Sequence, residues 1–345
     1  MVGPFCFSVL GAMTLSVASF TLLGRAESLM QNRLTRSLFF CSQNRGCIEK
    51  KYQMVRMCRA KESEIQGALR GGFLSTSRDE KFADLAFPSA YRSADGTPRG
   101  FCNWLVPGQI MAGRYPHGTP WGSKTGSPTP QESRVHLDQL ITAGVDTFVC
   151  LQAEVPAQDA QVEWPESGII PHLSAAQGFR RYLPDAVAAA SDAKRATPRF
   201  LRFPIPDFGV PDMAALLPLV ASLAADVRRG AAVPYLHCWG GRGRAGTIGA
   251  CLLLALRIGP DAAAAAAAAA PSALAAGDAL GFVAAEEAAE AAEAALRTVQ
   301  AGYNTRVGED GGGSLSPETD GQRDFVRRFA RVLIAARPAA PPPAA

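Results

Sequence analysis

A cysteine and an arginine stand close together in one glycine-rich stretch of this sequence, residues 235–247, which reads YLHCWGGRGRAGT. Five residues separate Cys238 from Arg244. A free thiol with an ordinary pKa of about 8.5 is mostly protonated at neutral pH, but a helix N-terminus with basic neighbours lowers a thiol pKa to about 3.5–7.5. Cys238 is therefore a candidate nucleophile, and the planar fork of Arg244 can hold two oxygens of a tetrahedral oxyanion. A thiolate that faces a bound phosphate predicts in-line attack and a cysteinyl-phosphate intermediate.

The residues on either side predict the geometry that this chemistry needs. The apolar run at 232–236 is typical of a buried strand, and the run at 248–256 is typical of a buried helix. A strand that turns through glycines into a helix leaves several backbone N–H groups directed at one point, beside the positive end of the helix dipole. We therefore expect an anion site in this turn. The residues expected to line it are Trp239, Gly240, Gly241, Arg242 and Gly243.

A second motif precedes the first. Residues 206–211 read Pro-Asp-Phe-Gly-Val-Pro, and Asp207 lies 31 residues before Cys238. Together the two motifs resemble the signatures of the cysteine-dependent protein tyrosine phosphatases, in which His-Cys, five residues and Arg follow a mobile acid loop. That loop usually reads Trp-Pro-Asp-x-Gly-Val-Pro, and Ile205 here replaces its tryptophan. The short gap between the motifs is similar to that of the smaller, atypical dual-specificity members.

The resemblance implies a role for each central residue. Cys238 would be the nucleophile, and Arg244 would bind the phosphate and its developing charge. Asp207 would protonate the leaving oxygen and then deprotonate the hydrolytic water, which is worth about 10²–10⁴ in rate. His237 would orient the loop from behind. The glycines that would let the backbone wrap the phosphate without a Cβ in the way are Gly241, Gly243 and Gly246.

Ala245 departs from the family pattern. Related enzymes usually place Ser or Thr directly after the arginine, where the hydroxyl assists departure of the thiolate in the second step. Thr247 stands two residues further on, where we expect it to point elsewhere on the helix. This predicts that the phosphoenzyme forms normally and is hydrolysed slowly. The alternative is a phosphate-binding module without turnover.

The substrate class stays open at this stage. The resemblance implies a phosphotyrosine phosphatase that also accepts phosphoserine or phosphothreonine, since the Lys-Asn-Arg-Tyr stretch that walls a deep phosphotyrosine slot is absent. Arg242 is the residue that lipid- and inositol-phosphate-directed relatives often use to meet further phosphates, although it can equally be a solvent-facing charge. A sulfurtransferase also places a cysteine in such a turn, but it has no use for Asp207 in an acid loop.

The implied fold class is α/β, with a central, mostly parallel sheet flanked by helices, as in the dual-specificity phosphatases. We predict a strand, a turn at Pro107-Gly108 and a second strand within 101–116, a helix around 135–141 that Gly144 ends, and a strand at 145–151. Residues 152–199 are expected to form an irregular excursion. Residues 200–205 form the strand that delivers Asp207.

The C-terminal half is expected to be helical. Asp212 is predicted to cap a helix at 213–229 and is the second candidate acid. The alanine-rich stretch 261–295 is predicted to be a helical insertion that buries little, because alanine offers little surface. A capped last helix follows residue 316. In it Gln322 is either a positioner of the hydrolytic water or, more plainly, a solvated helix residue.

These elements define the domain organisation. The catalytic domain is expected at 101–335, with a second, loop-like insertion at 117–130, after a linker at 62–100 and before a disordered tail at 336–345. Residues 1–24 carry no charge, and residues 25–61 hold nine Lys or Arg against two Glu. Residues 1–61 therefore indicate an organellar (plastid or mitochondrial) presequence or, alternatively, a secretory signal or a membrane anchor. Without such a leader the protein is expected in the cytoplasm, and membrane contact is expected only if the apolar segment is retained.

Composition limits the remaining function classes. The net charge of +4 over 345 residues belongs to the leader, so nucleic acid is not an expected partner. The eight cysteines and four histidines are scattered without metal-ligand spacing, so no metal and no cofactor are expected. A working thiolate also favours a reducing compartment. The expected partners are phosphorylated proteins, phosphorylated small molecules or phosphorylated lipids.

Overall fold

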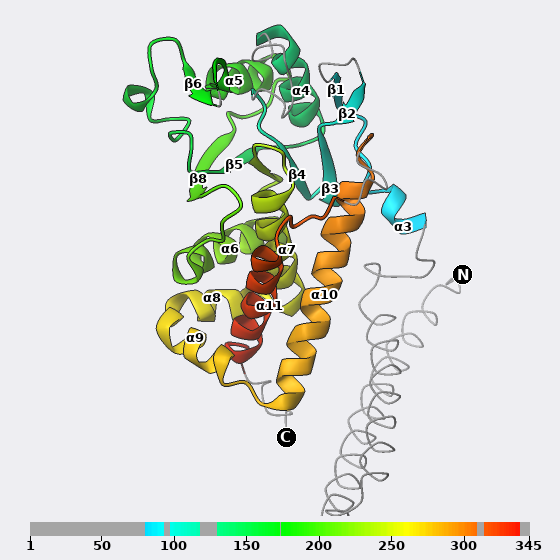
Figure 1. Ribbon diagram of the computed structural model, residues 1–345, viewed down its shortest axis with the longest axis vertical. Coiled ribbons are helices and arrows are strands. Elements are labelled where there is room, and N and C mark those ends of the chain that lie inside the picture. Colours follow the sequence, from blue (N-terminus) through cyan, green and yellow to red (C-terminus); the bar gives the residue numbers. More distant parts are fainter. Residues whose placement is uncertain (1–79, 93–96, 118–129, 173, 309–313, 339–345) are drawn as a thin grey trace, which may run out of the picture. The chain divides into compact units, whose positions relative to one another are not determined.

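The computed structural model describes residues 80–92, 97–117, 130–172, 174–308 and 314–338 (Figure 1). The chain divides into two compact units, Met1–Thr76 and Ser77–Ala345, and all of the described residues belong to the second. The leader predicted at 1–61, the linker up to residue 79, the loop at 118–129 and the tail from residue 339 lie outside the described residues.

A five-stranded sheet forms the centre of this unit. The strand order is β3-β4-β9-β5-β8, in which β3 and β4 are antiparallel and the other neighbours are parallel. Every residue of β9 and β5 is buried, as expected for parallel strands that helices cover on both faces. The predicted α/β class with a mostly parallel sheet is confirmed. The bounds are Cys102–Val106 for β3, Ile110–Arg114 for β4, Thr147–Gln152 for β5, Arg199–Ile205 for β8 and Pro234–Cys238 for β9.

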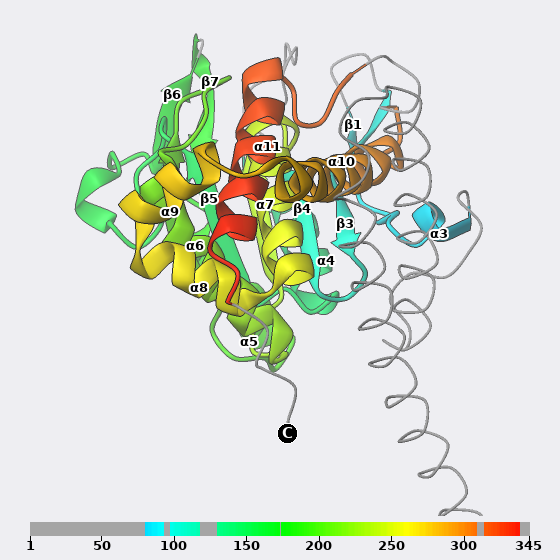
Figure 2. The same cartoon turned by 90° about the horizontal axis from the view of Figure 1, so that it is seen from below.

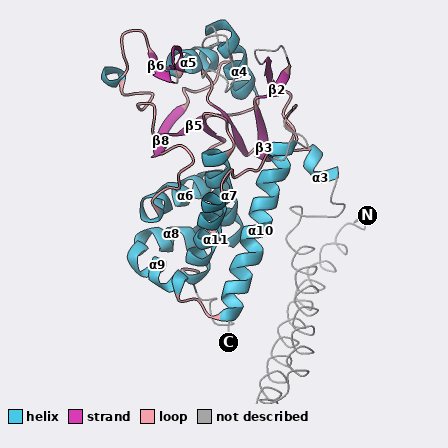
Figure 3. Cartoon of the chain, in the orientation of Figure 1, coloured by secondary structure: helices cyan, strands magenta, loops and turns pink. Residues whose placement is uncertain are grey.

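Helices lie on both sides of the sheet (Figures 1 and 3). The smaller layer consists of α4 and α5, and the larger layer consists of α6, α7, α8, α9, α10 and α11. Each layer has its own apolar cluster against the sheet. The helices are α4 (Pro130–Thr142), α5 (Leu183–Asp192), α6 (Met213–Arg228), α7 (Gly243–Ile258), α8 (Pro260–Ala268), α9 (Ala270–Asp278), α10 (Phe282–Asn304) and α11 (Asp320–Ala335).

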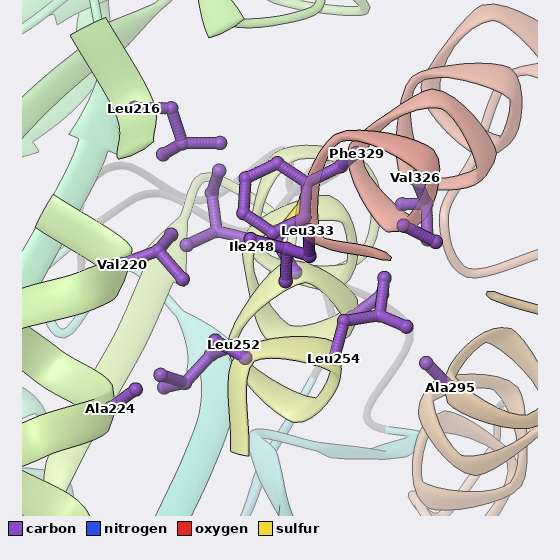
Figure 4. Close-up of a cluster of buried hydrophobic side chains, with 14 of the residues drawn as sticks. Leu216, Val220, Ala224, Ile248, Leu252, Leu254, Ala295, Val326, Phe329 and Leu333 are labelled. Atoms are coloured by element: carbon purple, nitrogen blue, oxygen red, sulfur yellow. The ribbon is translucent and has the colours of Figure 1, made fainter. Parts of the chain in front are cut away.

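Helix α7 lies in the middle of the larger cluster, directly behind the glycine-rich turn. Its Ile248 and Leu252 face Leu216 and Val220 of α6, while Phe329 of α11 closes the cluster from the other side (Figure 4). Because neighbours surround α7, its sequence is apolar on every side and not amphipathic. This packing fixes the start of α7 relative to the end of β9.

The alanine-rich stretch is helical as predicted, but the expectation that it buries little is wrong. Ala263, Ala266, Ala288 and Ala292 are fully buried in the same cluster as α7. Small side chains let helix backbones approach one another closely, so close packing replaces side-chain bulk. At Gly277 of α9 an added Cβ would lie 3.0 Å from the Val332 side chain of α11. Figure 2 shows α11 beside α7, with α9 on one side and α10 on the other, and α11 packs against all three.

Two other expectations need correction. The predicted linker contains ordered structure from residue 80 onward: α3 (Glu80–Ala83), then β1 (Ala90–Arg92) paired with β2 (Pro98–Gly100). Leu85 is buried, and its carbonyl oxygen accepts a hydrogen bond from Trp104 N at 2.8 Å. These residues therefore belong to the same compact unit as the sheet.

The excursion at 152–199 is more regular than expected. It contains a short 3-10 helix (Gln161–Glu163), the antiparallel pair β6 (Ile169–His172) and β7 (Ser174–Arg180), and helix α5. In this stretch the apolar residues follow neither a helical nor an alternating spacing throughout, and several prolines interrupt both patterns. The sequence therefore did not predict these elements.

No single helix among the described residues is long and apolar enough to cross a membrane. The pair α7 and α8 meets the length and composition criterion only when taken together, and it is bent by 110°.

Candidate active site

Cys238 is the last residue of β9, and α7 begins five residues later at Gly243. Residues 239–243, the last of which is the first residue of α7, are called the cysteine loop below. The predicted strand, turn and helix are thus confirmed. Gly241 has a φ of 66°, and a Cβ there would lie 2.1 Å from the carbonyl carbon of Gly113 in β4. Only glycine fits this close approach in the left-handed region.

Surrounding donors hold the backbone carbonyls of the cysteine loop. Arg306 donates to the carbonyl oxygens of Gly240 at 3.2 Å and Gly241 at 2.9 Å. The hydroxyl of Ser316 donates to the carbonyl oxygen of Arg242 at 2.8 Å. The N–H and C=O groups of one trans peptide point in opposite directions, so the N–H groups of residues 241–243 face away from these donors. That orientation leaves the N–H groups available for the anion predicted between Cys238 and α7.

Arg306 is the least expected part of this arrangement. It is 2 % exposed, and its other hydrogen bonds go to Asn103 Oδ1 at 2.8 Å and to the Ala112 carbonyl oxygen at 3.0 Å. Burial lowers the pKa of its guanidinium. No motif marks Arg306 in the sequence, because it follows the alanine-rich helix α10 and only the fold brings it beneath the loop.

Arg244 is the second buried arginine, and its guanidinium lies between two carboxylates. Its Nη1 lies 2.8 and 2.6 Å from the two oxygens of Glu154, and its Nη2 lies 2.9 Å from Asp207 Oδ1. Burial lowers the pKa of Arg244, but the charges of Cys238, Glu154 and Asp207 outweigh that effect and raise it. The guanidinium therefore stays charged and oriented. Glu154, two residues beyond β5, is a functional residue that the sequence reasoning missed.

The acid loop, residues 206–211, brings Asp207 to Arg244. Strand β8 ends at Ile205, and the loop then turns through a hydrogen bond from Gly209 N to the Pro206 carbonyl oxygen at 2.9 Å. Phe208 has a φ of 57°, which is uncommon for a residue with a side chain. The Asp207 side chain is 36 % exposed, so solvent reaches this carboxylate while Arg244 beside it is buried.

Gln322 attaches the acid loop to α11, and the interpretation of this glutamine as a solvated residue is wrong. Its side chain is fully buried, and its Nε2 donates to the Gly209 carbonyl oxygen at 3.0 Å. Its Oε1 accepts from the backbone N–H groups of Glu318 and Thr319, and Thr319 completes the capping box of α11. A capping box is visible in the sequence, but the contact with the acid loop is not.

His237 lies in β9 directly before Cys238, and the role in orienting the loop that the resemblance implies stays a prediction. It is fully buried, its Nε2 is hydrogen-bonded to the Tyr182 hydroxyl at 2.7 Å, and burial together with Arg244 lowers its pKa to about 3. The ring is therefore neutral at physiological pH. Trp239 lies beside it on the cysteine loop, with its ring edge-on to Phe179 at 5.9 Å between centroids.

The remaining candidate residues fall outside the reacting centre. Ala245 is buried, and the Thr247 hydroxyl donates to the Gly243 carbonyl oxygen at 2.9 Å, so it points along α7 as expected. Asp212 caps α6 by accepting a hydrogen bond from Ala215 N at 2.8 Å, so of the two candidate acids only Asp207 is paired with Arg244.

Three buried histidines predict how stability depends on pH. Burial is the main cause that lowers the pKa of His117 to about 3, of His136 to about 4 and of His237 to about 3. A histidine in the unfolded chain has a pKa of about 6.5. Below that pH the unfolded chain therefore binds protons that the folded chain does not bind. The free energy of unfolding should therefore fall as the pH is lowered, by up to about 4 kcal/mol per pH unit near pH 5. Each of the three protons contributes about 1.36 kcal/mol per pH unit.

Guanidinium unfolding followed by far-UV circular dichroism between pH 7 and 4.5 measures this slope. His136→Gln should reduce it by about one proton, because the glutamine cannot titrate. The carboxyls of Asp185 and Glu318, whose pKa values burial raises, act in the opposite sense, because the folded chain keeps their protons to a higher pH than the unfolded chain does. A stability that stays flat from pH 6.5 to 5 would contradict the neutral state of these rings.

Comparison with known proteins adds to this geometry. Residues 184–297 match the family model described as "PTP-SAK: Swiss Army Knife protein, DSP-PTPase phosphatase domain", a stretch that includes the acid loop and the cysteine loop. This chain is also similar to a solved structure entitled "Crystal structure of Tk-PTP in the active form". The two sequences are 18 % identical, and the match covers 71 % of this chain and 97 % of that chain, with a TM-score of 0.34. A search of curated proteins found no match.

Proposed function

We propose that this chain, a dual-specificity-like member of the protein tyrosine phosphatase superfamily, hydrolyses phosphate monoesters of proteins through a covalent intermediate on Cys238. The observation that carries the proposal is the position of Arg244, which follows Cys238 across the cysteine loop and has Glu154 on one side and Asp207 on the other. This arrangement supports an anion site that combines a nucleophile, an oxyanion clamp and a proton donor.

The first step forms the intermediate. The Cys238 thiolate attacks the phosphorus atom, a sulfur–phosphorus bond forms, and the bond between phosphorus and the ester oxygen breaks. Asp207 transfers a proton to that oxygen, so the substrate leaves as an alcohol or a phenol. The N–H groups of the cysteine loop and the Arg244 guanidinium hold the three remaining oxygens, on which charge develops.

The second step restores the enzyme. Water attacks the phosphorus atom from the side that the alcohol has left, and Asp207 takes its proton. The sulfur–phosphorus bond breaks, which releases orthophosphate and regenerates the thiolate. Glu154 supports both steps because it holds Nη1 of Arg244 at 2.6 Å and so orients the Nη2 edge, which faces Asp207. Phosphate bound in the loop would compete for that edge and free Asp207 to face the leaving oxygen.

Hydrolysis of para-nitrophenyl phosphate, inhibition by vanadate and acid-quench trapping of phosphate on Cys238 test this proposal together. Mass spectrometry of the quenched peptide that contains Cys238 identifies the covalent bond. Turnover with a trapped phosphocysteine supports the proposal. Phosphate or vanadate binding without turnover supports the alternative of a binding module, which the alanine at position 245 favours. The absence of both binding and turnover would overturn both functions.

Ala245 gives a kinetic prediction for the same assay. Since no hydroxyl follows Arg244 and the Thr247 hydroxyl bonds to the Gly243 carbonyl oxygen, departure of the thiolate lacks assistance. Stopped-flow mixing with para-nitrophenyl phosphate should show a burst of nitrophenolate near one equivalent of enzyme. Ala245→Ser should raise steady-state turnover by about tenfold, the scale of one modest hydrogen bond, and shrink the burst.

Ala245→Gly serves as the matched control, because it changes the same position without adding a hydroxyl. It should leave the burst in place. A linear time course, with no gain from Ala245→Ser, would mean that hydrolysis of the intermediate does not limit turnover.

A further inference from the structure

We infer that Glu318 and Arg242 make this site selective for substrates with a single phosphate group, an inference that rests on the proposed phosphatase function. Arg242 lies in the cysteine loop and carries the basic side chain that could meet a second phosphate. Its Nη2 lies 2.5 Å from Glu318 Oε1, and both side chains are partly buried, at 31 % and 25 % exposed. The guanidinium is thus already engaged by a carboxylate of the same chain.

The Glu318 carboxylate lies against the cysteine loop itself. Its Oε2 would be 3.1 Å from a Cβ added to Gly243, the residue with which α7 begins. Burial raises the pKa of this carboxyl, Asp207 adds to the rise, and Arg242 and Arg244 oppose it. The Glu318 carboxylate therefore interacts electrostatically with Asp207 and with Arg244. Its negative charge lies at the edge of the anion site.

The backbone on both sides of the pair is anchored. Ser316 Oγ donates to the Arg242 carbonyl oxygen at 2.8 Å, and Glu318 N donates to the buried Gln322 Oε1 at 3.0 Å. Arg323 Nη1 donates to the Pro317 carbonyl oxygen at 2.8 Å. The segment 316–318 is therefore held against the cysteine loop, and the ion pair forms without ordering a free chain segment.

The consequence for substrates follows from charge. One phosphate binds to the N–H groups of the loop and to Arg244 and does not need Arg242. A second phosphate within reach of Arg242 meets the Glu318 carboxylate, and repulsion between partly buried anions is screened less than in water. The pair consequently selects phosphomonoesters such as phosphorylated side chains, and it disfavours molecules with clustered phosphates.

Competition by two inhibitors measures this selectivity. Inorganic phosphate and myo-inositol hexakisphosphate are compared as inhibitors of para-nitrophenyl phosphate hydrolysis for the wild type, Glu318→Gln and the double variant Glu318→Gln/Arg242→Gln. Glu318→Gln should strengthen inhibition by the hexakisphosphate by about tenfold and inhibition by phosphate by less than about threefold. The double variant should lose the gain, because it no longer carries the released guanidinium.

Glu293→Gln is the matched control. It removes the same charge from another arginine–glutamate pair, with Arg327 Nε 2.8 Å from Glu293 Oε1, between α10 and α11. It should leave the ratio of the two inhibition constants at the wild-type value. An equal gain for both inhibitors in Glu318→Gln, or the same gain in Glu293→Gln, would reduce the effect to net charge and overturn the inference.

Two further measurements keep the test decisive. In the wild type the hexakisphosphate should inhibit no more than about tenfold better than phosphate, and an advantage of about a hundredfold would contradict the inference even if Glu318→Gln failed to fold. If the chain binds phosphate without turnover, calorimetric titration of the same two anions gives the same comparison. Failure of the proposed catalysis and failure of the selectivity are therefore distinguishable.

Discussion

Replacing Cys238 with serine should abolish hydrolysis of para-nitrophenyl phosphate, with a loss of about 10⁴-fold or more, the scale of removing a nucleophile. A serine hydroxyl is much less acidic than a cysteine thiol, and the Nε2 of the adjacent His237 is hydrogen-bonded to Tyr182. The backbone N–H groups and Arg244 remain, so vanadate and phosphate should still bind. Steady-state kinetics and calorimetric titration with vanadate separate these two effects.

Cys251→Ala provides the matched control for that experiment. Cys251 is a fully buried cysteine of α7 that packs in the apolar cluster. Its loss should lower stability by about 1 kcal/mol, as for a small group removed from a core, and should leave turnover in place. Turnover retained in Cys238→Ser, or lost equally in Cys251→Ala, would remove Cys238 from the mechanism.

Asp207→Asn should lower kcat/KM, which reports formation of the phosphoenzyme, by about 10²–10⁴ for alkyl phosphates and by much less for para-nitrophenyl phosphate. The physical reason is the leaving group, because nitrophenolate departs without a proton while an alkoxide does not. Asparagine keeps the side-chain shape and an oxygen that can accept from Arg244 Nη2, so the loop geometry should persist. A series of aryl phosphates with rising leaving-group pKa measures the effect as a steeper dependence of log kcat/KM on that pKa.

Asp212→Asn tests the same chemistry at the second candidate acid. Because Asp212 caps α6 and lies outside the Arg244 pair, this variant should change stability by less than about 1 kcal/mol and should leave the leaving-group dependence unchanged. A leaving-group dependence that steepens in Asp212→Asn and not in Asp207→Asn would reverse the assignment of the acid.

Arg306 explains how a glycine-rich loop keeps one shape. Glycines allow the close approach to β4 but offer many other conformations, so their carbonyl groups must be held by something else. The buried guanidinium holds the carbonyl oxygens of Gly240 and Gly241 and is fixed in turn by Asn103 of β3. The order of the anion site thus depends on the contact of α10 with the sheet.

Local signals made the central elements predictable. Cys238 and Arg244 are close because one strand, one turn and one helix join them, and glycine spacing together with apolar runs records that unit in adjacent residues. The strand before Asp207 and the cap at Asp212 are predictable for the same reason. The burial of the alanine-rich helices was not predictable, because an alanine in the sequence does not indicate whether another backbone packs against it.

What the sequence by itself determined is therefore the chemistry: a cysteine, an arginine and an aspartate in two short motifs whose geometry is local. What only the tertiary structure decided is the set of partners that orient this chemistry. Glu154 lies 90 residues from Arg244, Arg306 lies 65 from Gly241, and Gln322 lies 113 from Gly209. Contacts over such separations leave no periodic or motif-like trace, since they exist only after β5, α10 and α11 pack around α7 and bring distant polar side chains to the same site.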